Sequence, residues 1–500
     1  MPTFSSAIAS PLFFDWRNKS PQVFRNSAII RAATMTLTTE QLDKFTREEL
    51  LELVIRQQEI IALLQAEVAA LKAELEKFRR PPATSRNSSR PPSLDRKANS
   101  DPQRKKRKKS RRGHARQTRP LVDNPDQIIP VPVTECQSCQ ANLAKVKPER
   151  IIRRQVTEIP PVKPFIIETQ QHEVLCPHCH QINRGLLPES LEADRFFGPK
   201  LAARVVYYKQ TQHLSYERIV ATMRDLYGVD LSEGGIAAML RRAGECAKPV
   251  AEQIKEQVSA SRVIKSDETS ARVKGRNWWQ WVFVGLSRAY HHIGPTRSAA
   301  EIRAVLGDRR VEKWVSDCFT AQLKAPAKEF QLCLAHQLRD LDRVIEIFPK
   351  QSWAKALKVF FRRAIHLRNR FHRKEPMTTA GYVRRVFQLE SELDELLSRP
   401  VHNPGARNLK ERFLTHRDKL LVFLHDPDVP PTNNESERAL RTSVIHRKVT
   451  NCFRSEWGAK AYAALQSVIA TARLKGENIF DALVKLMGKP IDRYLQPSSP

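Results

Sequence analysis

One segment of the sequence, residues 79–119, has a composition that cannot form a hydrophobic core. It contains 16 Lys and Arg residues against two acids, Asp95 and Asp101. Such a segment stays disordered until an anionic partner binds it. We therefore expect a basic linker, placed at residues 81–125, between an N-terminal part and the rest of the chain. The bases expected to contact phosphates, those of DNA among them, are Arg104, Lys105, Lys106, Arg107, Lys108 and Lys109. RNA and acidic proteins are alternative partners, and a solvated tail is the alternative to a binding segment.

The whole chain is also basic. Its 500 residues include 85 Lys and Arg against 54 Asp and Glu, which gives a formal net charge of +31. A nucleic acid is the most common partner for such a charge. No apolar run is long enough to span a membrane, so no membrane partner is expected. Eight Cys residues in a chain of this length exclude a disulfide scaffold and favour a reducing cytoplasm.

Residues 1–34 carry none of the periodic patterns that appear later. They contain one acid and four basic residues among many small ones. That composition is compatible with a transit peptide. The alternative is that translation starts at Met35, where a regular pattern begins, and that residues 1–34 are an unpatterned extension.

A long helix is predicted from residue 38 to residue 80, inside a segment of residues 35–80. Thr39 is the expected N-cap, and no Gly or Pro interrupts residues 36–80. A heptad pattern of apolar residues predicts a short coiled coil that joins copies of the chain. The alternative is an amphipathic helix packed on its own domain. Heptad position a holds Arg47, Val54, Ile61, Val68 and Leu75, and position d holds Leu50, Gln57, Leu64, Leu71 and Phe78.

Two Cys-x-x-Cys pairs lie in residues 126–185. They are Cys136 with Cys139, and Cys176 with Cys179. Residues 149–158 and 164–174 between them favour strands, and two such pairs joined by strands predict a zinc ribbon with four thiolate ligands. The gap between the pairs is longer than usual. The alternative is two inert thiol pairs, and His178 and His180 are spare ligands.

Residues 186–255 are predicted to be helical. Ser215 and Ser232 are expected N-caps on either side of a turn at residues 228–231. Two helices joined by a short turn are typical of a helix-turn-helix that reads DNA. Helix pairs of this kind are also common in proteins that bind no DNA, so both interpretations stay open.

From Arg262 the pattern changes to strands. Residues 262–269, 278–285 and 289–293 predict three strands, residues 298–306 a helix, and residues 311–317 and 329–336 two more strands. This order is typical of a ribonuclease-H-like fold, in which the first and fourth strands are neighbours. Asp267 and Asp317 would then stand close together. The first part of this catalytic domain is placed at residues 256–345.

Two carboxylates so placed repel each other unless hydrogen bonds or cations offset the repulsion. Magnesium binds carboxylate and phosphate oxygens, and a metal pair activates the nucleophile in phosphodiester attack. A third acid is expected on a later helix, where Glu435 and Glu437 are the candidates. Arg438 and Arg441 accompany Glu437 in helical register. The alternative is ordinary surface acids at the ends of strands and helices.

Several motifs together match one family. They are residues 87–93 (Asn-Ser-Ser-Arg-Pro-Pro-Ser), the two cysteine pairs with Ile159-Pro160 between them, residues 214–232, Ser266-Asp267-Glu268-Thr269 with the Trp-rich strand, Ser316-Asp317, Cys333-x-x-His336, Asn433-Asn434-x-x-Glu437-Arg438-x-Leu440-Arg441 and Arg447-Lys448. From about Met35 to Gly488 the chain resembles the transposases of the insertion sequence 66 family, of the DDE class. Thr432 departs from the family pattern, which usually has Asp there, and the glycine-rich stretch after the linker is reduced to Arg112-Gly113-His114.

The resemblance implies a multidomain α+β protein that binds two Mg²⁺ or Mn²⁺ ions through Asp267, Asp317 and Glu437. It implies a helical insertion at residues 346–430, and the last helices of the catalytic domain at residues 431–488. The expected partners are element ends and target DNA, further copies of the chain, and accessory proteins of the same element, in a bacterial cytoplasm beside the nucleoid. The basic residues expected on DNA near the third acid are Arg438, Arg441, Arg447 and Lys448.

The expected function is metal-dependent strand cleavage and strand transfer at the ends of the protein's own insertion sequence. One alternative is a zinc-dependent DNA-binding protein, or an inactive relic of a transposase. Another is a ribonuclease-H-like nuclease or resolvase that cuts DNA without joining it. All share the same acids or the same basic segments, so the sequence leaves these alternatives open.

Overall fold

The computed structural model describes residues 45–79, 120–188, 191, 196–373 and 377–488. The chain divides into two compact units, Met1–Ala83 and Thr84–Pro500, and each is considered separately. The predicted extension at residues 1–34 and the six consecutive bases at residues 104–109 lie outside the described residues. Among the described helices, none combines the length and the apolar character needed to cross a membrane.

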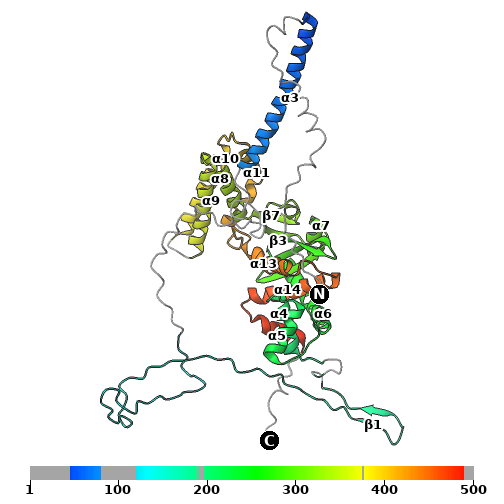
Figure 1. Cartoon of the computed structure of the whole chain (residues 1–500), viewed down its shortest axis with the longest axis vertical. Helices are drawn as coiled ribbons and strands as arrows, with labels where there is room; N and C mark the ends of the chain where they lie inside the picture. The colour runs from blue at the N-terminus through cyan, green and yellow to red at the C-terminus, as the bar shows by residue number, and fades with distance from the viewer. Residues whose placement is uncertain (1–44, 80–119, 189–190, 192–195, 374–376, 489–500) are drawn as a thin grey trace, which may run out of the picture. The chain divides into compact units, whose positions relative to one another are not determined.

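The N-terminal unit contains the helix α3 (Arg47–Arg79), drawn in blue in Figure 1. The Thr46 hydroxyl accepts a hydrogen bond from the Glu49 amide, and the Glu49 carboxylate accepts one from the Thr46 amide. This reciprocal capping box fixes the start of α3. The predicted N-cap, Thr39, lies outside the described residues. Five apolar side chains of the predicted seam are exposed within this unit: Val54, Ile61, Leu64, Val68 and Leu71.

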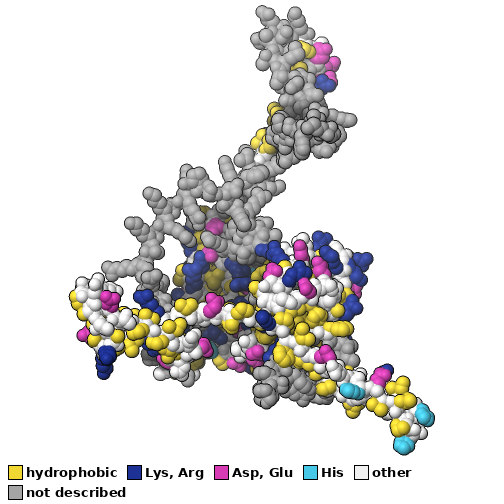
Figure 2. All heavy atoms as spheres, turned by 60° about the horizontal axis from the view of Figure 1, so that its bottom comes forward, with side chains coloured by type: hydrophobic (Ala, Val, Ile, Leu, Met, Phe, Trp, Pro, Cys, Tyr) yellow, Lys and Arg dark blue, Asp and Glu magenta, His cyan; other side chains and the backbone are white. Residues whose placement is uncertain are grey.

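Residues 120–188 form little regular structure. An isolated bridge joins Glu135 to Asn142, and the short strands β1 (Glu173–Leu175) and β2 (Ile182–Arg184) pair as a hairpin. The strands predicted at residues 149–158 and 164–174 are wrong, apart from the two residues that begin β1. In the part of the chain that the structure describes, no strand pairs with residues 149–158 or 164–172, and side chains such as Ile151, Val156 and Ile166 are exposed. Figure 2 shows many hydrophobic side chains on the surface of this extended segment.

Three helices follow: α4 (Pro199–Gln210), α5 (Tyr216–Tyr227) and α6 (Glu233–Ser259). Ser215 and Ser232 are the N-caps of α5 and α6, as predicted. Gly228 ends α5 at φ 64°, a left-handed conformation that suits glycine. The long helix α6 runs past the predicted boundary at residue 255, and Val258 still belongs to the core that it shares with the sheet.

The central sheet is mixed and has five strands, which gives the α+β architecture that was predicted. The strands are β3 (Val263–Val273), β4 (Arg276–Gly285), β5 (Arg288–Gly294), β6 (Val311–Ser316) and β7 (Ala327–Leu332), with α7 (Ala299–Leu306) between β5 and β6. Their order is β5-β4-β3-β6-β7, so the first and fourth strands are neighbours, as predicted. The prediction that the first strand ends at its acids is wrong, because β3 continues to Val273 in a long ladder with β4.

The last strand also differs from the prediction, which continued it to His336. It ends at Leu332, and α8 (Leu334–Ile347) begins two residues later. Leu334, Leu341 and Val344 are buried at helical spacing, which explains why this stretch is a helix. Helical structure therefore begins at Leu334, within the segment of residues 256–345 predicted as the first part of the catalytic domain.

The insertion packs around its own core and against the sheet edge. After α8 it contains α9 (Ser352–His372), α10 (Thr379–Ser398), α11 (Pro404–Thr415) and α12 (Val422–His425). These helices, which lie side by side in Figure 1, bury Phe360, Phe361 and Phe413 in one cluster with Val315 and Leu332 from β6 and β7. The shared cluster ties the insertion to the strands that flank Asp317.

Three helices complete the unit: α13 (Asn434–Thr450), α14 (Glu456–Leu474) and α15 (Ile479–Met487). The Thr471 and Ser467 hydroxyls of α14 accept hydrogen bonds from the amides of Ala289 and His291 on the edge strand β5. These contacts occupy amides that would otherwise be open to pairing with another strand.

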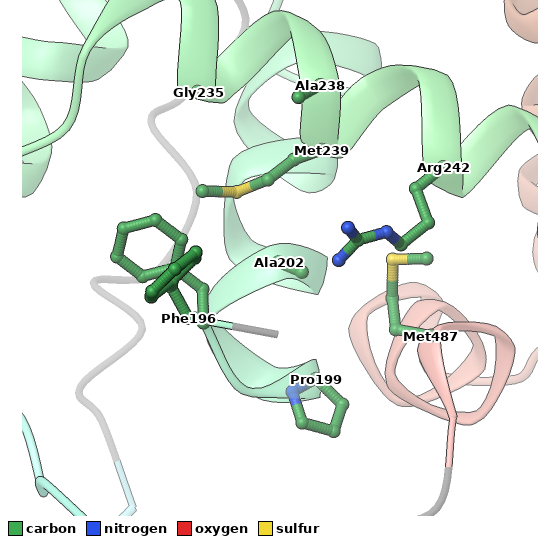
Figure 3. Close-up of a pocket in the computed structure, with 9 residues that line it drawn as sticks. Phe196, Pro199, Ala202, Gly235, Ala238, Met239, Arg242 and Met487 are labelled. Carbon is green, nitrogen blue, oxygen red and sulfur yellow. The ribbon is translucent and has the colours of Figure 1, made fainter. Parts of the chain in front are cut away.

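A small hollow of about 150 Å³ opens where α4, α6 and α15 meet. Figure 3 shows its lining, with Pro199 and Ala202 from α4, Met239 and Arg242 from α6, and Met487 from α15. Its surface is mostly apolar, and Arg242 supplies the one charged group among the residues that line it. We assign no chemistry to it.

Candidate active site

The pairing of β3 with β6 sets the positions of the first two acids. These strands are parallel, with Lys265 opposite Val315. Asp267 and Asp317 each come two residues later, so they lie at the same level of the sheet and on the same face. The prediction that adjacent strands bring these two acids together is consistent with this register.

The third acid reaches the same place from α13. Asp267 is directly opposite Val282 of β4, and directly opposed side chains share a face of a sheet. Val282 packs in one cluster with Leu440 of α13. Asp267 therefore faces the helix that carries Glu437 in its first turn.

Burial and mutual repulsion perturb the acids. Burial raises the pKa of Asp267 well above its usual value, and the charges of Glu268, Asp317 and Glu437 raise it further. Burial and the Glu268 charge raise the pKa of Asp317 to about 6, although the Phe319 amide and Arg297 act in the opposite direction. Acids that oppose each other's ionisation in this way are stabilised together by a cation.

Glu268 is a buried acid that the sequence analysis did not single out. Its side chain is 1% exposed and accepts hydrogen bonds from Arg297 at 2.7 Å and from Gln322 at 2.7 Å. The Arg297 guanidinium also lies 3.9 Å from the ring centroid of Phe319. This network holds a fourth negative charge beside Asp317. Two consecutive acids in a strand, Asp267 and Glu268, were the one signal for it in the sequence.

Glu437 has a second set of neighbours. Its Oε1 lies 3.7 Å from Nδ1 of His336 and 3.5 Å from the Arg339 guanidinium. Within the described residues, the only group of three potential metal ligands whose donor atoms all lie within 4.8 Å of one another is Cys333, His336 and Glu437. The charges of Asp317 and Glu437 therefore affect the pKa of Asp267, but the carboxylate oxygens of the three acids do not all lie within 4.8 Å of one another. Burial, with Arg339 and Arg412, lowers the pKa of His336 to about 4, so this imidazole is neutral at neutral pH.

Asn433 fixes α13 against β3. Its buried side-chain amide donates to the Ser266 carbonyl at 2.6 Å and accepts from the Ser436 hydroxyl at 2.7 Å. Its backbone amide donates to Cys333 Sγ at 3.2 Å. One side chain therefore connects the residue before Asp267 to the residue before Glu437.

Replacing Asn433 with Ala should lower the free energy of unfolding by about 2–4 kcal/mol, because it leaves two buried polar partners unsatisfied. Denaturant unfolding of the full chain measures this. The matched control is Asn434→Ala at the exposed neighbouring position, with an expected change within about 0.5 kcal/mol. Equal effects of the two substitutions would show that the Asn433 contacts do not contribute to the free energy of unfolding.

The predicted DNA-binding residues near α13 divide into two groups. Arg438, Arg441 and Lys448 are exposed on the helix. Arg447 is half-buried and donates hydrogen bonds to Thr269 and to Ser270 on β3, so it supports the strand.

Each predicted zinc-binding pair forms its own turn. The Gln140 amide donates to the Cys136 carbonyl and the His180 amide to the Cys176 carbonyl, with Gln140 and His180 in the left-handed region. Hydrogen bonds from the Cys139 and Ser138 amides lower the pKa of Cys136, and those from Cys179 and His178 lower that of Cys176. Among the residues described, all four cysteines are free thiols, and the structure does not bring the two pairs to one point.

Comparison with known proteins places the chain among DNA transposases. Residues 195–461, more than half of the chain, match the family described as Transposase IS66 family. The protein therefore belongs to the IS66 transposase family. The matched region contains Asp267, Asp317 and Glu437. The chain is also 24% identical to an uncharacterized protein, y4hP, of Sinorhizobium fredii (strain NBRC 101917 / NGR234), over 74% of each chain.

Proposed function

We propose that this protein is a DDE transposase that cuts and joins DNA at the ends of its own insertion sequence, with Asp267, Asp317 and Glu437 as the catalytic acids. The observation that carries the proposal is the parallel register of the adjacent strands β3 and β6, in which Asp267 and Asp317 lie at one level of the sheet. The charges of Asp317 and Glu437 both raise the pKa of Asp267, which supports a shared centre. The strand order supports a ribonuclease-H-like catalytic domain.

The donor set suits Mg²⁺ or Mn²⁺. Buried carboxylates that raise one another's pKa offer the oxygen ligands that these ions prefer, and their repulsion is relieved by positive charge. When bound, two such ions would supply activation of the attacking hydroxyl or water and stabilisation of the leaving oxygen. We assign Asp267, Asp317 and Glu437 as the residues that would hold them.

The surrounding residues position these acids. Arg297 and Gln322 hold Glu268 beside Asp317, and Asn433 holds the start of α13 against β3. The neutral His336 imidazole and Arg339 border the Oε1 side of Glu437, so they limit its orientation. These contacts keep the acids ordered, and the Arg297 guanidinium pairs with the additional negative charge of Glu268.

DNA binding is assigned to a basic segment that precedes the catalytic centre in the sequence and to basic residues on α13. The six bases from Arg104 to Lys109 would bind phosphates independently of base sequence. Arg438 and Arg441 are exposed close to Glu437 along α13, and Lys448 is exposed in the last turn of the same helix. The α5–α6 pair, with its capped turn, is the candidate for reading bases as a helix-turn-helix.

The cysteine pairs are proposed to bind one zinc ion per chain through Cys136, Cys139, Cys176 and Cys179. Elemental analysis of the full-length protein should find one zinc, and Cys176→Ser should remove it because a closed structural site needs four ligands. The control is Cys246→Ser on α6, which should keep the zinc. A zinc-free, folded wild-type protein would contradict the ribbon.

The exposed seam of α3 supports assembly through a coiled coil, which would hold two element ends together. Accessory proteins of the same element are further expected partners.

A reconstituted reaction tests the proposed function. Full-length protein, a DNA with the element's two ends, and Mg²⁺ should give both cut ends and ends joined to a target. Cutting without joining would favour a nuclease or resolvase. Binding with neither product would favour a DNA-binding protein or an inactive relic.

A further inference from the structure

The helix α9 of the insertion carries basic residues but no acidic ones. Between Ser352 and His372 it contains six Lys and Arg residues and no Asp or Glu. Some of these bases make structural contacts: Lys358 pairs with Asp342, and Arg368 donates to the carbonyls of Pro427 and Val429.

Several of the remaining bases line one groove between α9 and α10. The groove has a volume of about 510 Å³ and is lined by Arg362, Arg363, His366 and Arg370 from α9, and by Arg385 and Glu392 from α10. Glu392 is the one acid among its lining residues, and its carboxylate lies 2.7 Å from Arg363. Four arginines against one glutamate leave the groove with a net charge of +3.

The spacing of these bases suits an extended anionic chain. Arg362, His366 and Arg370 follow one another at intervals of four residues, or about 6 Å along the helix axis. Arg385 borders the groove from the other helix. Guanidinium groups bind phosphate oxygens through two hydrogen bonds at once, which favours a row of phosphates over isolated carboxylates.

The groove is connected to the catalytic centre through packed residues. Leu367 and Leu389, at its floor, belong to the same hydrophobic cluster as Val315 of β6, two residues before Asp317. The groove therefore has a fixed position relative to that acid. Its apolar surface is small: Val359 is the exposed apolar side chain among its lining residues. A protein partner would need larger apolar anchors.

From these observations we propose that the groove between α9 and α10 binds the phosphate backbone of the DNA on which the enzyme acts. The proposal rests on the proposed function, and it adds a contact surface that the motifs did not indicate. Its role is to hold a duplex segment beyond the catalytic acids, independently of base sequence.

The test measures affinity for a duplex carrying an element end, as a function of salt, with full-length protein in buffer without Mg²⁺. Arg362→Gln combined with Arg385→Gln should lower the affinity at least about tenfold and reduce the log–log salt slope by about 2, because each phosphate contact contributes about 0.9. Both side chains are exposed on their helices, so folding should persist.

The matched control is Lys355→Gln combined with Arg384→Gln, which removes the same charge from exposed positions of α9 and α10 outside the groove. The control should keep the wild-type slope. An unchanged salt slope in the groove variant would overturn the proposal, and so would an equal loss of DNA affinity in the groove and control variants. A groove that binds an acidic protein would also leave DNA binding unchanged in the groove variant. A wild-type protein that binds DNA but neither cuts nor joins would refute the proposed function alone.

Discussion

Asp267→Asn, Asp317→Asn and Glu437→Gln are each expected to abolish cutting and joining while leaving DNA affinity nearly unchanged. Loss of a residue that supports a metal ligand typically costs 10- to 100-fold in activity, so loss of a ligand itself should exceed about 100-fold. DNA affinity should persist because it comes mainly from basic residues elsewhere in the chain. Gel assays of cut and joined products, with binding measured separately, give both quantities.

Glu435→Gln is the control for this set. Glu435 lies in the same helical turn as Glu437, but its half-exposed carboxylate pairs with Lys265 and does not contribute to the raised pKa of either Asp. We expect it to keep activity. If Glu435→Gln were inactive and Glu437→Gln active, the third acid would be Glu435. Activity in all four variants would refute the assignment of a DDE centre.

Ile61→Glu combined with Leu64→Glu is expected to dissociate the assembly and to prevent paired end joining. Both residues lie on the predicted seam, and both are exposed in the single chain. A charge buried in such a seam without a partner opposes association strongly. Light scattering of the full-length protein measures the mass.

The control for the seam is Leu63→Glu. Leu63 is as exposed as Ile61, with 57% against 53%, but it occupies heptad position c, outside the seam. It should leave the mass unchanged. A monomeric wild-type protein would remove the coiled coil from the account, and equal dissociation by Leu63→Glu would show that the assigned register is wrong.

The order of the central strands followed from local patterns. Each strand had its own apolar run, and α7 was marked by Ser298, which caps it. Neighbouring strands β3 and β6 then brought Asp267 and Asp317 to one level. This part of the site was predictable because it depends on topology and on the position of each acid along its own strand.

The remaining parts of the site depend on contacts between segments far apart in sequence. Glu268 is held by Gln322, 54 residues away, and Asn433 bonds to Ser266, 167 residues away. No local pattern identifies such pairs. His336 was noticed in a motif but was assigned to a strand, and its place in the first turn of α8 is what brings it to Glu437.

The two strands predicted between the cysteine pairs show a different limit. Alternating apolar residues form a strand when a neighbouring strand offers backbone hydrogen bonds and another surface buries the apolar side chains. Residues 149–158 have neither in the described chain, and Ile152 and Val156 are 70% and 93% exposed. The alternating pattern alone was therefore insufficient to predict a strand.

The acids should also control how stability depends on pH. The pKa of Asp317 rises from 3.8 to about 6 on folding. Its neutral form is the one favoured by the fold, so its contribution is fully present below pH 3.8 and is lost as the pH rises through 6. In metal-free protein the ionisation of Asp317 lowers the free energy of unfolding by up to about 3 kcal/mol at neutral pH. A cation should offset most of that loss.

The three acids are proposed to form a cation-binding centre, and the melting temperature at about pH 7.5 reports whether a cation binds there. In metal-free buffer Asp317→Asn should melt higher than the wild-type protein, because the amide removes a buried, repelled charge. Mg²⁺ should raise the melting temperature of the wild-type protein and leave that of Asp317→Asn nearly unchanged. The same Mg²⁺ response in both proteins, or none in the wild-type protein, would contradict the account.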